Sequence, residues 1–269
     1  MKRASEGMRT ALRPGFRLAA WVLLVAAPAA ASEPAKFLPE GSLRMMGARY
    51  LPAERDFQWD TWLSGEIGLV RLSGTTLLAE VEVETIMGNE RRAFDANQAN
   101  YHLEGAVKRA WGPRTVELFF SHVSRHAEDR PKPQTVDWNI LGLRLFGPLS
   151  RTPFPTRFLV SAGPTTRSSL VEYRFEVVGR LEADLVERPW GAFYLSAMFR
   201  GVKTESTAVL ARSGFVDVNV EGGARIRRGQ RSCHLFAAYE RRNDVYLLVP
   251  GLRNRALLGL RFGLTDKSE

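Results

Sequence analysis

Apolar and polar residues alternate with a period of two along most of the chain after residue 40. The clearest segment is 171–185, VEYRFEVVGRLEADL, in which one face is apolar apart from Gly179 and the other carries Glu, Arg and Asp apart from Val178. Segments 77–87, 215–227 and 255–264 repeat this pattern. Successive side chains of a β-strand point to opposite faces. The alternation therefore predicts strands with one apolar and one polar face.

Twelve segments of this kind follow one another, separated by connections that alternate in length. Their centres lie near residues 46, 65, 82, 106, 120, 141, 160, 178, 196, 220, 237 and 259. Tight turns at 73–75, 112–114, 189 and 228–230 alternate with longer polar connections at 88–99, 127–135, 202–213 and 243–253. An even strand number, short periplasmic turns and longer outer loops are typical of bacterial outer-membrane barrels. We therefore predict an all-β fold, an antiparallel transmembrane β-barrel of about 12 strands over residues 41–265.

A soluble β-sandwich or a lipocalin-like barrel also alternates apolar and polar residues, with the polar face in water. The segments of ten or more residues are longer than ordinary strands of that kind. The polar faces also carry matched opposite charges: Glu80, Glu82 and Glu84 against Arg174, Arg180, Arg225 and Arg227. Enclosed charges must be paired or hydrated. We therefore favour a membrane barrel with a closed interior crossed by Glu–Arg pairs, and a narrow anion-biased pore is the alternative.

Aromatic residues near the predicted strand ends fit the aromatic belts found where a membrane protein meets the two interfaces. They are Trp59, Trp62, Tyr101, Trp111, Trp138, Trp190 and Tyr239. The last strand departs from the usual outer-membrane pattern, because it ends at Leu264 instead of at an aromatic residue.

The N-terminus has the pattern of an export signal. Basic residues up to Arg17 precede an apolar stretch over 18–31 that ends in small residues before Ser32. This stretch is shorter than the roughly 20 residues that a membrane-spanning helix needs. We predict a cleaved signal peptide over 1–31, a periplasmic segment over 32–40, and a C-terminal tail over 266–269. The expected location is the cell outer membrane, and an uncleaved membrane anchor is the alternative.

Charge and composition exclude several classes of function. The net charge is +9, and residues 1–31 contribute five basic residues and one acidic residue to it. The remaining basic residues do not cluster with aromatic ones, so we expect no nucleic-acid partner. Cys233 is the single cysteine and the four histidines are scattered, so we expect no metal site and no cofactor. The expected partners are outer-membrane lipids, lipopolysaccharide and, during biogenesis, the barrel-assembly machinery.

Residues 119–126, FFSHVSRH, contain the candidate chemistry. His122, Ser124 and His126 continue the apolar face begun by Val116, Leu118 and Phe120, so we expect them to face lipid. The segment follows the tight turn at 112–114 and therefore runs away from the periplasm. In the next segment, keeping Arg144 inside turns Asp137 and Asn139 toward lipid beside them. A serine nucleophile, an imidazole base and a carboxylate form a hydrolytic set. The candidate catalytic residues are His122, Ser124, His126 and Asp137.

Two other interpretations of this segment remain open. Polar groups at head-group depth cost little free energy, so the leading interpretation is that the histidines and the serine are plain interface residues of a barrel with a structural or lipid-interacting task. A hydrolase acting on lipid A or phospholipid acyl esters is the alternative. Arg125 beside them is the right kind of side chain to hold a lipid A phosphate without any chemistry.

The segment resembles the motif of lipid A 3-O-deacylases, which are outer-membrane barrels with a His-x-Ser-Asn motif on a lipid-facing strand and an acid on the next strand. His122-Val123-Ser124 matches the first part, and Asp137 stands in the place of the acid. Arg125 replaces the asparagine, and the motif lies mid-chain here. The chain from about 40 to 264 is also similar to a family of outer-membrane barrels of unknown function, including the run into Glu128 and Asp129. The first resemblance implies release of an acyl chain, and the second implies only fold and location.

Overall fold

The computed structural model describes residues 34–127, 136–205, 213–243 and 253–267. The predicted signal peptide, the acidic pair Glu128 and Asp129, and the end of the predicted C-terminal tail lie outside the described residues. Within the described part of the chain, no helix is long and apolar enough to cross a membrane.

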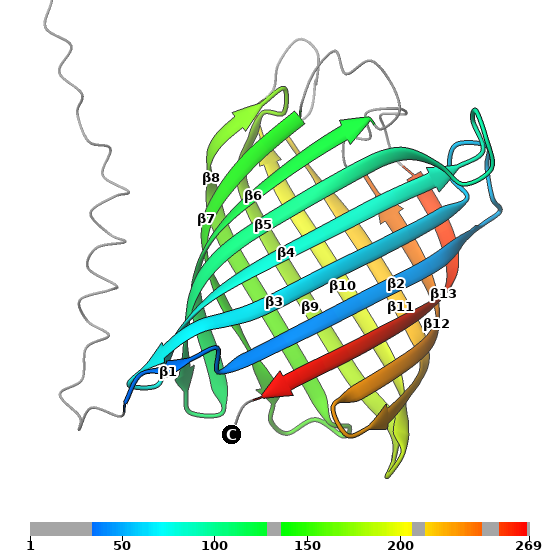
Figure 1. Cartoon of the computed structure of the whole chain (residues 1–269). Coiled ribbons are helices and arrows are strands. Elements are labelled where there is room, and N and C mark those ends of the chain that lie inside the picture. Colours follow the sequence, from blue (N-terminus) through cyan, green and yellow to red (C-terminus); the bar gives the residue numbers. More distant parts are fainter. Residues whose placement is uncertain (1–33, 128–135, 206–212, 244–252, 268–269) are drawn as a thin grey trace, which may run out of the picture.

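The fold is a closed antiparallel barrel of twelve long strands (Figure 1). Each strand pairs with the next one in sequence, and β2 pairs with β13 to close the wall. The strands are β2 (Glu40–Leu51), β3 (Trp59–Leu72), β4 (Thr75–Gly88), β5 (Asp95–Trp111), β6 (Arg114–Ala127), β7 (Val136–Leu149), β8 (Thr156–Ser169), β9 (Tyr173–Arg188), β10 (Gly191–Thr204), β11 (Gly214–Arg228), β12 (Arg231–Arg242) and β13 (Arg253–Lys267). The predicted fold class and all twelve predicted segments are therefore confirmed.

The two ends of the barrel differ in their connections. Tight turns join β3 to β4, β5 to β6, β9 to β10 and β11 to β12 at the end where the chain's C-terminus also lies (Figure 1). We call this the turn end and the opposite one the loop end. The predicted rhythm has two exceptions, since residues 150–155 make a longer connection at the turn end and residues 170–172 make a short one at the loop end.

Both ends of the barrel segment extend slightly beyond the predicted boundaries. Strand β1 (Lys36–Phe37) lies within the predicted periplasmic segment and pairs with β3 through Lys36–Arg71 and Phe37–Val70, in line with β2. Strand β13 continues to Lys267, where it pairs with Glu40 of β2, so two residues of the predicted tail belong to the wall. Backbone hydrogen bonds to the neighbouring strand determine where these strands end, and the alternation of side chains does not predict those hydrogen bonds.

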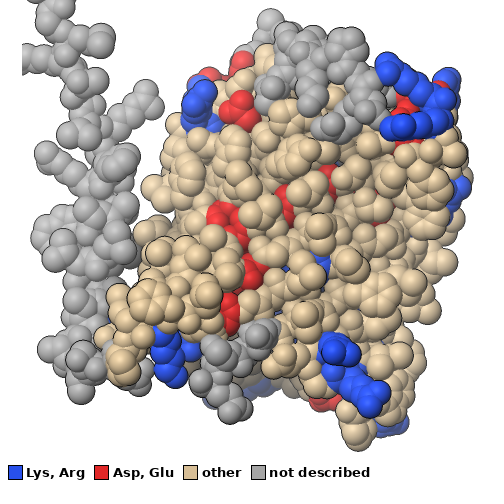
Figure 2. Space-filling view, in the orientation of Figure 1, with Lys and Arg blue, Asp and Glu red and all other residues tan. Residues whose placement is uncertain are grey.

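The outer surface of the wall is apolar. Large exposed apolar side chains occur on strands all around it, among them Leu63, Val81, Leu103, Leu143, Leu181 and Leu235. In Figure 2, Lys and Arg side chains gather at the two ends of the barrel, uncharged residues cover most of the wall between them, and acidic atoms show in a narrow diagonal line. Such an apolar band between polar ends is the surface of a protein that stands in a bilayer.

The interior contains buried polar residues and two apolar clusters. One cluster includes Trp138, Tyr173 and Phe215, and the other includes Tyr50 and Phe236. The expectation that Trp138 lies in an outer aromatic belt is therefore wrong, because its side chain is buried inside the barrel. Trp138 directly neighbours outward-facing residues in β7, and alternation turns it inward. Trp111, Trp190 and Tyr239 are exposed, as expected.

Candidate functional site

The register of β5, β6 and β7 brings the predicted residues together on the outer face. Residue pairs across β6 and β7 are His122–Asn139 and Ser124–Asp137. On the other side, Tyr101 of β5 pairs with Ser124. Directly paired residues in a sheet point to the same face. We call His122, Ser124 and His126 the outer row, and it lies in the loop-end half of β6.

Hydrogen bonds organise the outer row. His122 Nδ1 lies 2.6 Å from Asn139 Oδ1. Because an amide oxygen only accepts, Nδ1 carries the proton and Nε2 is left as the basic nitrogen. His126 Nε2 lies 3.3 Å from Ser124 Oγ, and the His126 ring packs edge-on against Tyr101 with centroids 5.5 Å apart. The serine therefore lies between two imidazoles, one of which is oriented by an amide on the neighbouring strand.

Asp137, the predicted acid, lies beside Ser124 but takes no part in these hydrogen bonds. Within the described residues no hydrogen bond joins it to His122, Ser124 or His126. Its direct register partner is the serine, whereas Asn139 is the direct partner of His122. The sequence pointed to Asp137 instead of Asn139, because a hydrolytic set of serine and histidine usually contains an acid. The sequence signal for Asn139 is only its place on the lipid-facing side of the neighbouring strand, and the register then puts it directly opposite His122.

The side chains on the inner face of β6 have different surroundings from those of the outer row. The Arg125 side chain is buried inside the barrel, with its guanidinium carbon 5.0 Å from the centre of the Trp138 ring. The interpretation that Arg125 holds a lipid phosphate is therefore wrong, because alternation along β6 turns it away from lipid. Ser121 Oγ also faces inward and lies 2.7 Å from His102 Nε2. We call His102 and Ser121 the inner pair.

Ion pairs cross the interior at several levels. Arg144 contacts Glu104 and Glu117, both at 2.7 Å, and its guanidinium packs 4.5 Å from the centre of the Phe119 ring. Further pairs join Arg242 to Glu84, Arg261 to Glu221, Arg200 to Glu176, Arg225 to Glu182 and Asp184, and Arg44 to Glu80. Glu–Arg pairs are therefore present in the interior, but the expected partners are wrong. Among the described residues, Glu80 and Glu84 pair with Arg44 and Arg242 instead of with the arginines of β9 and β11. Glu82 differs from its neighbours in β4, since it lies 4.0 Å from His102 Nδ1.

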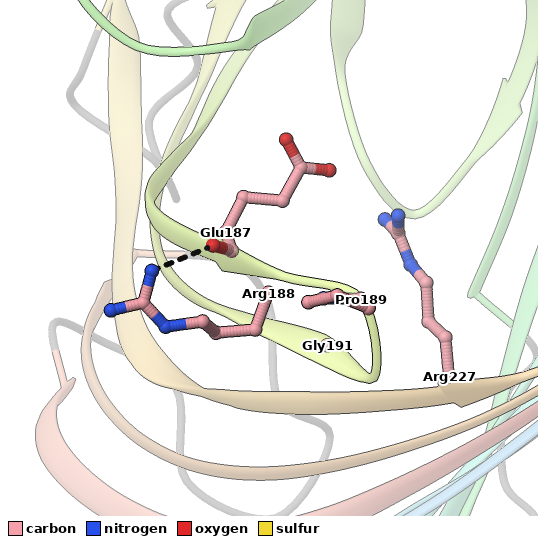
Figure 3. Close-up of a pocket in the computed structure, with 5 residues that line it drawn as sticks. All are labelled: Glu187, Arg188, Pro189, Gly191 and Arg227. Atoms are coloured by element: carbon pink, nitrogen blue, oxygen red, sulfur yellow. Dashed lines mark hydrogen bonds between the residues drawn. The ribbon is translucent and has the colours of Figure 1, made fainter.

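A cavity of about 440 Å³ lies at the turn end, far along the wall from the outer row. Figure 3 shows its lining residues Glu187, Arg188, Pro189, Gly191 and Arg227, with the side chains of Glu187 and Arg227 directed into the same space. Arg188 donates a hydrogen bond to the Glu187 carbonyl oxygen at 3.4 Å. No residue of the outer row contributes to this cavity, so the two features are separate.

Comparisons with known proteins show the fold. No family model matches the chain, and no curated protein matches it. Among solved structures, the chain is similar to the outer membrane phospholipase (OMPLA) dimer with bound calcium of Salmonella typhi, with 15% identity, a TM-score of 0.54, and coverage of 84% of this chain and 90% of that one.

It is also similar to the translocator domain of the autotransporter NalP of Neisseria meningitidis, with 9% identity, a TM-score of 0.43 and 93% of each chain covered. A third similar structure is the KdgM porin, with 10% identity, a TM-score of 0.47, and coverage of 82% of this chain and 98% of that one. The closed topology and the similarity to the phospholipase together give the chain the fold of an outer-membrane β-barrel. Proteins with different tasks share that fold, so function has to be argued from the site.

Proposed function

We propose that this protein stands in the bacterial outer membrane and hydrolyses acyl esters of membrane lipids, with Ser124 as nucleophile, His122 as general base and Asn139 as the group that orients the base. The observation that carries the proposal is the 2.6 Å hydrogen bond from His122 Nδ1 to Asn139 Oδ1. It leaves Nε2 free to accept the serine proton, on the face of the wall where lipid esters are found.

The choice of His122 over His126 as the base rests on this orienting partner. His126 is hydrogen-bonded to Ser124 Oγ, but within the described residues its second ring nitrogen has no partner that would hold the tautomer. No direct hydrogen bond joins His122 to Ser124 in the described part of the chain. Catalytic hydrogen bonds are often long before substrate binds, and neighbours two apart on one strand face are about 7 Å apart at Cα. We infer that the imidazole closes onto the serine when lipid occupies the site.

The reaction follows from these roles. Ser124 Oγ attacks the acyl carbonyl carbon while His122 Nε2 takes the hydroxyl proton, and that proton then passes to the departing lipid alcohol. Water, activated by the same nitrogen, cleaves the acyl-serine ester and releases the fatty acid, and Ser124 recovers its proton. The phospholipase among the similar structures is consistent with such a task on this fold.

The interior supports a closed barrel instead of a transport path. Buried ion pairs such as Arg144 with Glu104 and Glu117 cross it, and aromatic side chains fill parts of it. Eight-stranded barrels are filled by side chains alone, whereas wider ones need such networks or hold water. We therefore propose that the function lies on the outer surface of the wall.

The test uses the full chain folded in detergent or in vesicles, with wild type compared with Ser124→Ala. Mass spectrometry of phospholipid and of lipopolysaccharide should show acyl release by wild type, and a rate at least about 1,000-fold lower for the variant, because the nucleophile is gone. Ser121→Ala is the matched control, since it removes a serine hydroxyl from the inner face of the same strand. Unchanged lipids with wild type would end the hydrolase proposal. Acyl loss from lipopolysaccharide alone would make lipid A the substrate, as the resemblance to lipid A deacylases implies.

A further inference from the structure

One cation lies on the outer face next to the proposed site. Arg167 of β8 is the direct register partner of Asn139, so its side chain leaves the wall on the same side as the outer row. Adjacent strands are about 5 Å apart, which places the Arg167 backbone one strand from Asn139 and about 10 Å from that of His122. An arginine side chain spans much of that distance through its flexible stem.

Arg167 differs from the arginines of the interior. Many of those arginines form ion pairs, as Arg144 does with Glu104. Arg167 is exposed and, among the described residues, forms no hydrogen bond or ion pair. The nearest acid along the register, Asp137, is diagonal to it on β7 and forms no ion pair with it. The guanidinium is therefore available to a ligand.

Its position along β8 indicates the kind of ligand. Arg167 lies two residues before the end of β8 at the loop end. A cation on the lipid-facing side costs about 2–4 kcal/mol at the bilayer midplane and close to nothing near the interface. At the interface the available anions are lipid phosphates, and the planar guanidinium matches a phosphate with two parallel hydrogen bonds.

We propose that Arg167 binds the phosphate of the lipid whose ester Ser124 attacks, and that it selects phosphate-bearing ester lipids as substrates. The inference rests on the proposed function. In a glycerophospholipid the acyl carbonyl and the phosphate are a few bonds apart, which suits a nucleophile and a guanidinium two strands apart. Asn139 then lies between the two groups, orienting the base on one side and flanking the phosphate site on the other.

The test compares Arg167→Gln with Arg167→Lys, and uses Arg241→Gln as control. Arg241 of β12 is also exposed on the outer face near the loop end, without an ion pair among the described residues, and it lies four strands away. Acyl release is measured on three substrates: phosphatidylethanolamine, lipopolysaccharide, and diacylglycerol, which has the ester but no phosphate.

We expect Arg167→Gln to lower kcat/KM on phosphatidylethanolamine by about 10- to 100-fold, the factor typical of a lost charge-assisted hydrogen bond. Hydrolysis of diacylglycerol should change less than about 2-fold, since it has no group for the guanidinium to bind. Arg167→Lys should retain part of the activity, and Arg241→Gln should match wild type. A loss confined to lipopolysaccharide would support the role of Arg167 with lipid A phosphate as its ligand.

The inference is overturned if Arg167→Gln loses the same factor on diacylglycerol as on phosphatidylethanolamine, because that indicates a general effect on the wall. It is also overturned if no substrate is affected. Both outcomes leave the hydrolase proposal standing, because wild type is active in each. A wild-type protein that is inactive on all three substrates, like Ser124→Ala, would instead refute the hydrolase proposal, and this inference with it.

Discussion

Strand β6 carries a serine hydrogen-bonded to a histidine on each of its two faces. Inside, Ser121 lies 2.7 Å from His102, which has carboxylates of Glu82 and Glu104 at 4.0 Å. Outside, Ser124 lies 3.3 Å from His126, and His122 is held by the amide of Asn139. By residue type alone, the inner pair is the better match to a serine, histidine and acid set.

The surroundings reverse that ranking. The inner pair belongs to a network in which Glu104 is also bound by Arg144, on the closed side of the wall. The outer row faces the side where lipid esters lie and has a nitrogen left free by the His122–Asn139 bond. The side of the wall, more than the set of side chains, therefore separates a structural network from a candidate for catalysis.

Removing one imidazole at a time should give the largest difference in hydrolysis rate between the two faces of β6. His122→Ala is expected to lower lipid ester hydrolysis by about 1,000-fold, because it removes the base, and general-base catalysis contributes about 100- to 10,000-fold. His102→Ala should leave the rate within about 3-fold, and His126→Ala should cost about 10-fold through loss of the serine contact. The measurement is the initial rate of fatty acid release by correctly folded protein. A larger loss for His126→Ala than for His122→Ala would transfer the role of base to His126.

The second prediction concerns the ion pairs of the interior, which a change of Arg144 should break. Arg144→Met is expected to lower the free energy of unfolding by about 3 kcal/mol, because it leaves Glu104 and Glu117 without their shared cation in the interior. Urea titration in detergent, followed by the mobility shift of unboiled barrels on gels, measures this. Arg157→Met is the matched control, since its side chain is half-exposed beside Glu182, and an exposed pair contributes less than about 1 kcal/mol.

The same samples test the closed interior. Wild type should show no large steady conductance in planar bilayers, since ion pairs and aromatic residues occupy the interior. A steady pore current would instead support the alternative of an anion-biased pore.

In the stability experiment, equal free energies of unfolding for the Arg144→Met and Arg157→Met variants would show that the inner ion pairs contribute little to folding.

The smallest expected change in hydrolysis rate concerns Asp137 and Asn139, the two polar residues of β7 beside the outer row. Asn139→Ala should lower kcat about 10-fold or more, because the tautomer of His122 is then no longer held. Asp137→Ala should change it less than about 3-fold, since no hydrogen bond joins Asp137 to the outer row among the described residues. A larger effect for Asp137→Ala would restore the acid that sequence analysis placed in the site.

Much of this architecture was predictable from the sequence. The period of two in each segment determines strands with two unlike faces, and the twelve segments with their turns determine an antiparallel barrel. The same alternation placed His122, Ser124 and His126 on the apolar side of β6, where the register of β5 and β7 also puts them. These features can be predicted from each segment by itself. One face of every strand meets lipid and the other meets the polar interior, so each segment carries the alternation in its own sequence.

Other features depended on the tertiary structure. Which residue of β7 lies opposite His122 is set by the length of the preceding connection and the register of the pairing, so the sequence alone could not choose between Asp137 and Asn139. The burial of Trp138 and the pairing of Arg144 with Glu104 and Glu117 follow from closure of the wall, which brings several strands around one interior. The place of Arg167 beside Asn139 likewise depends on an irregularity in the β7–β8 register. Side-chain alternation therefore decided which face each residue takes, whereas its partners on that face were decided by register and closure, which are properties of the assembled sheet.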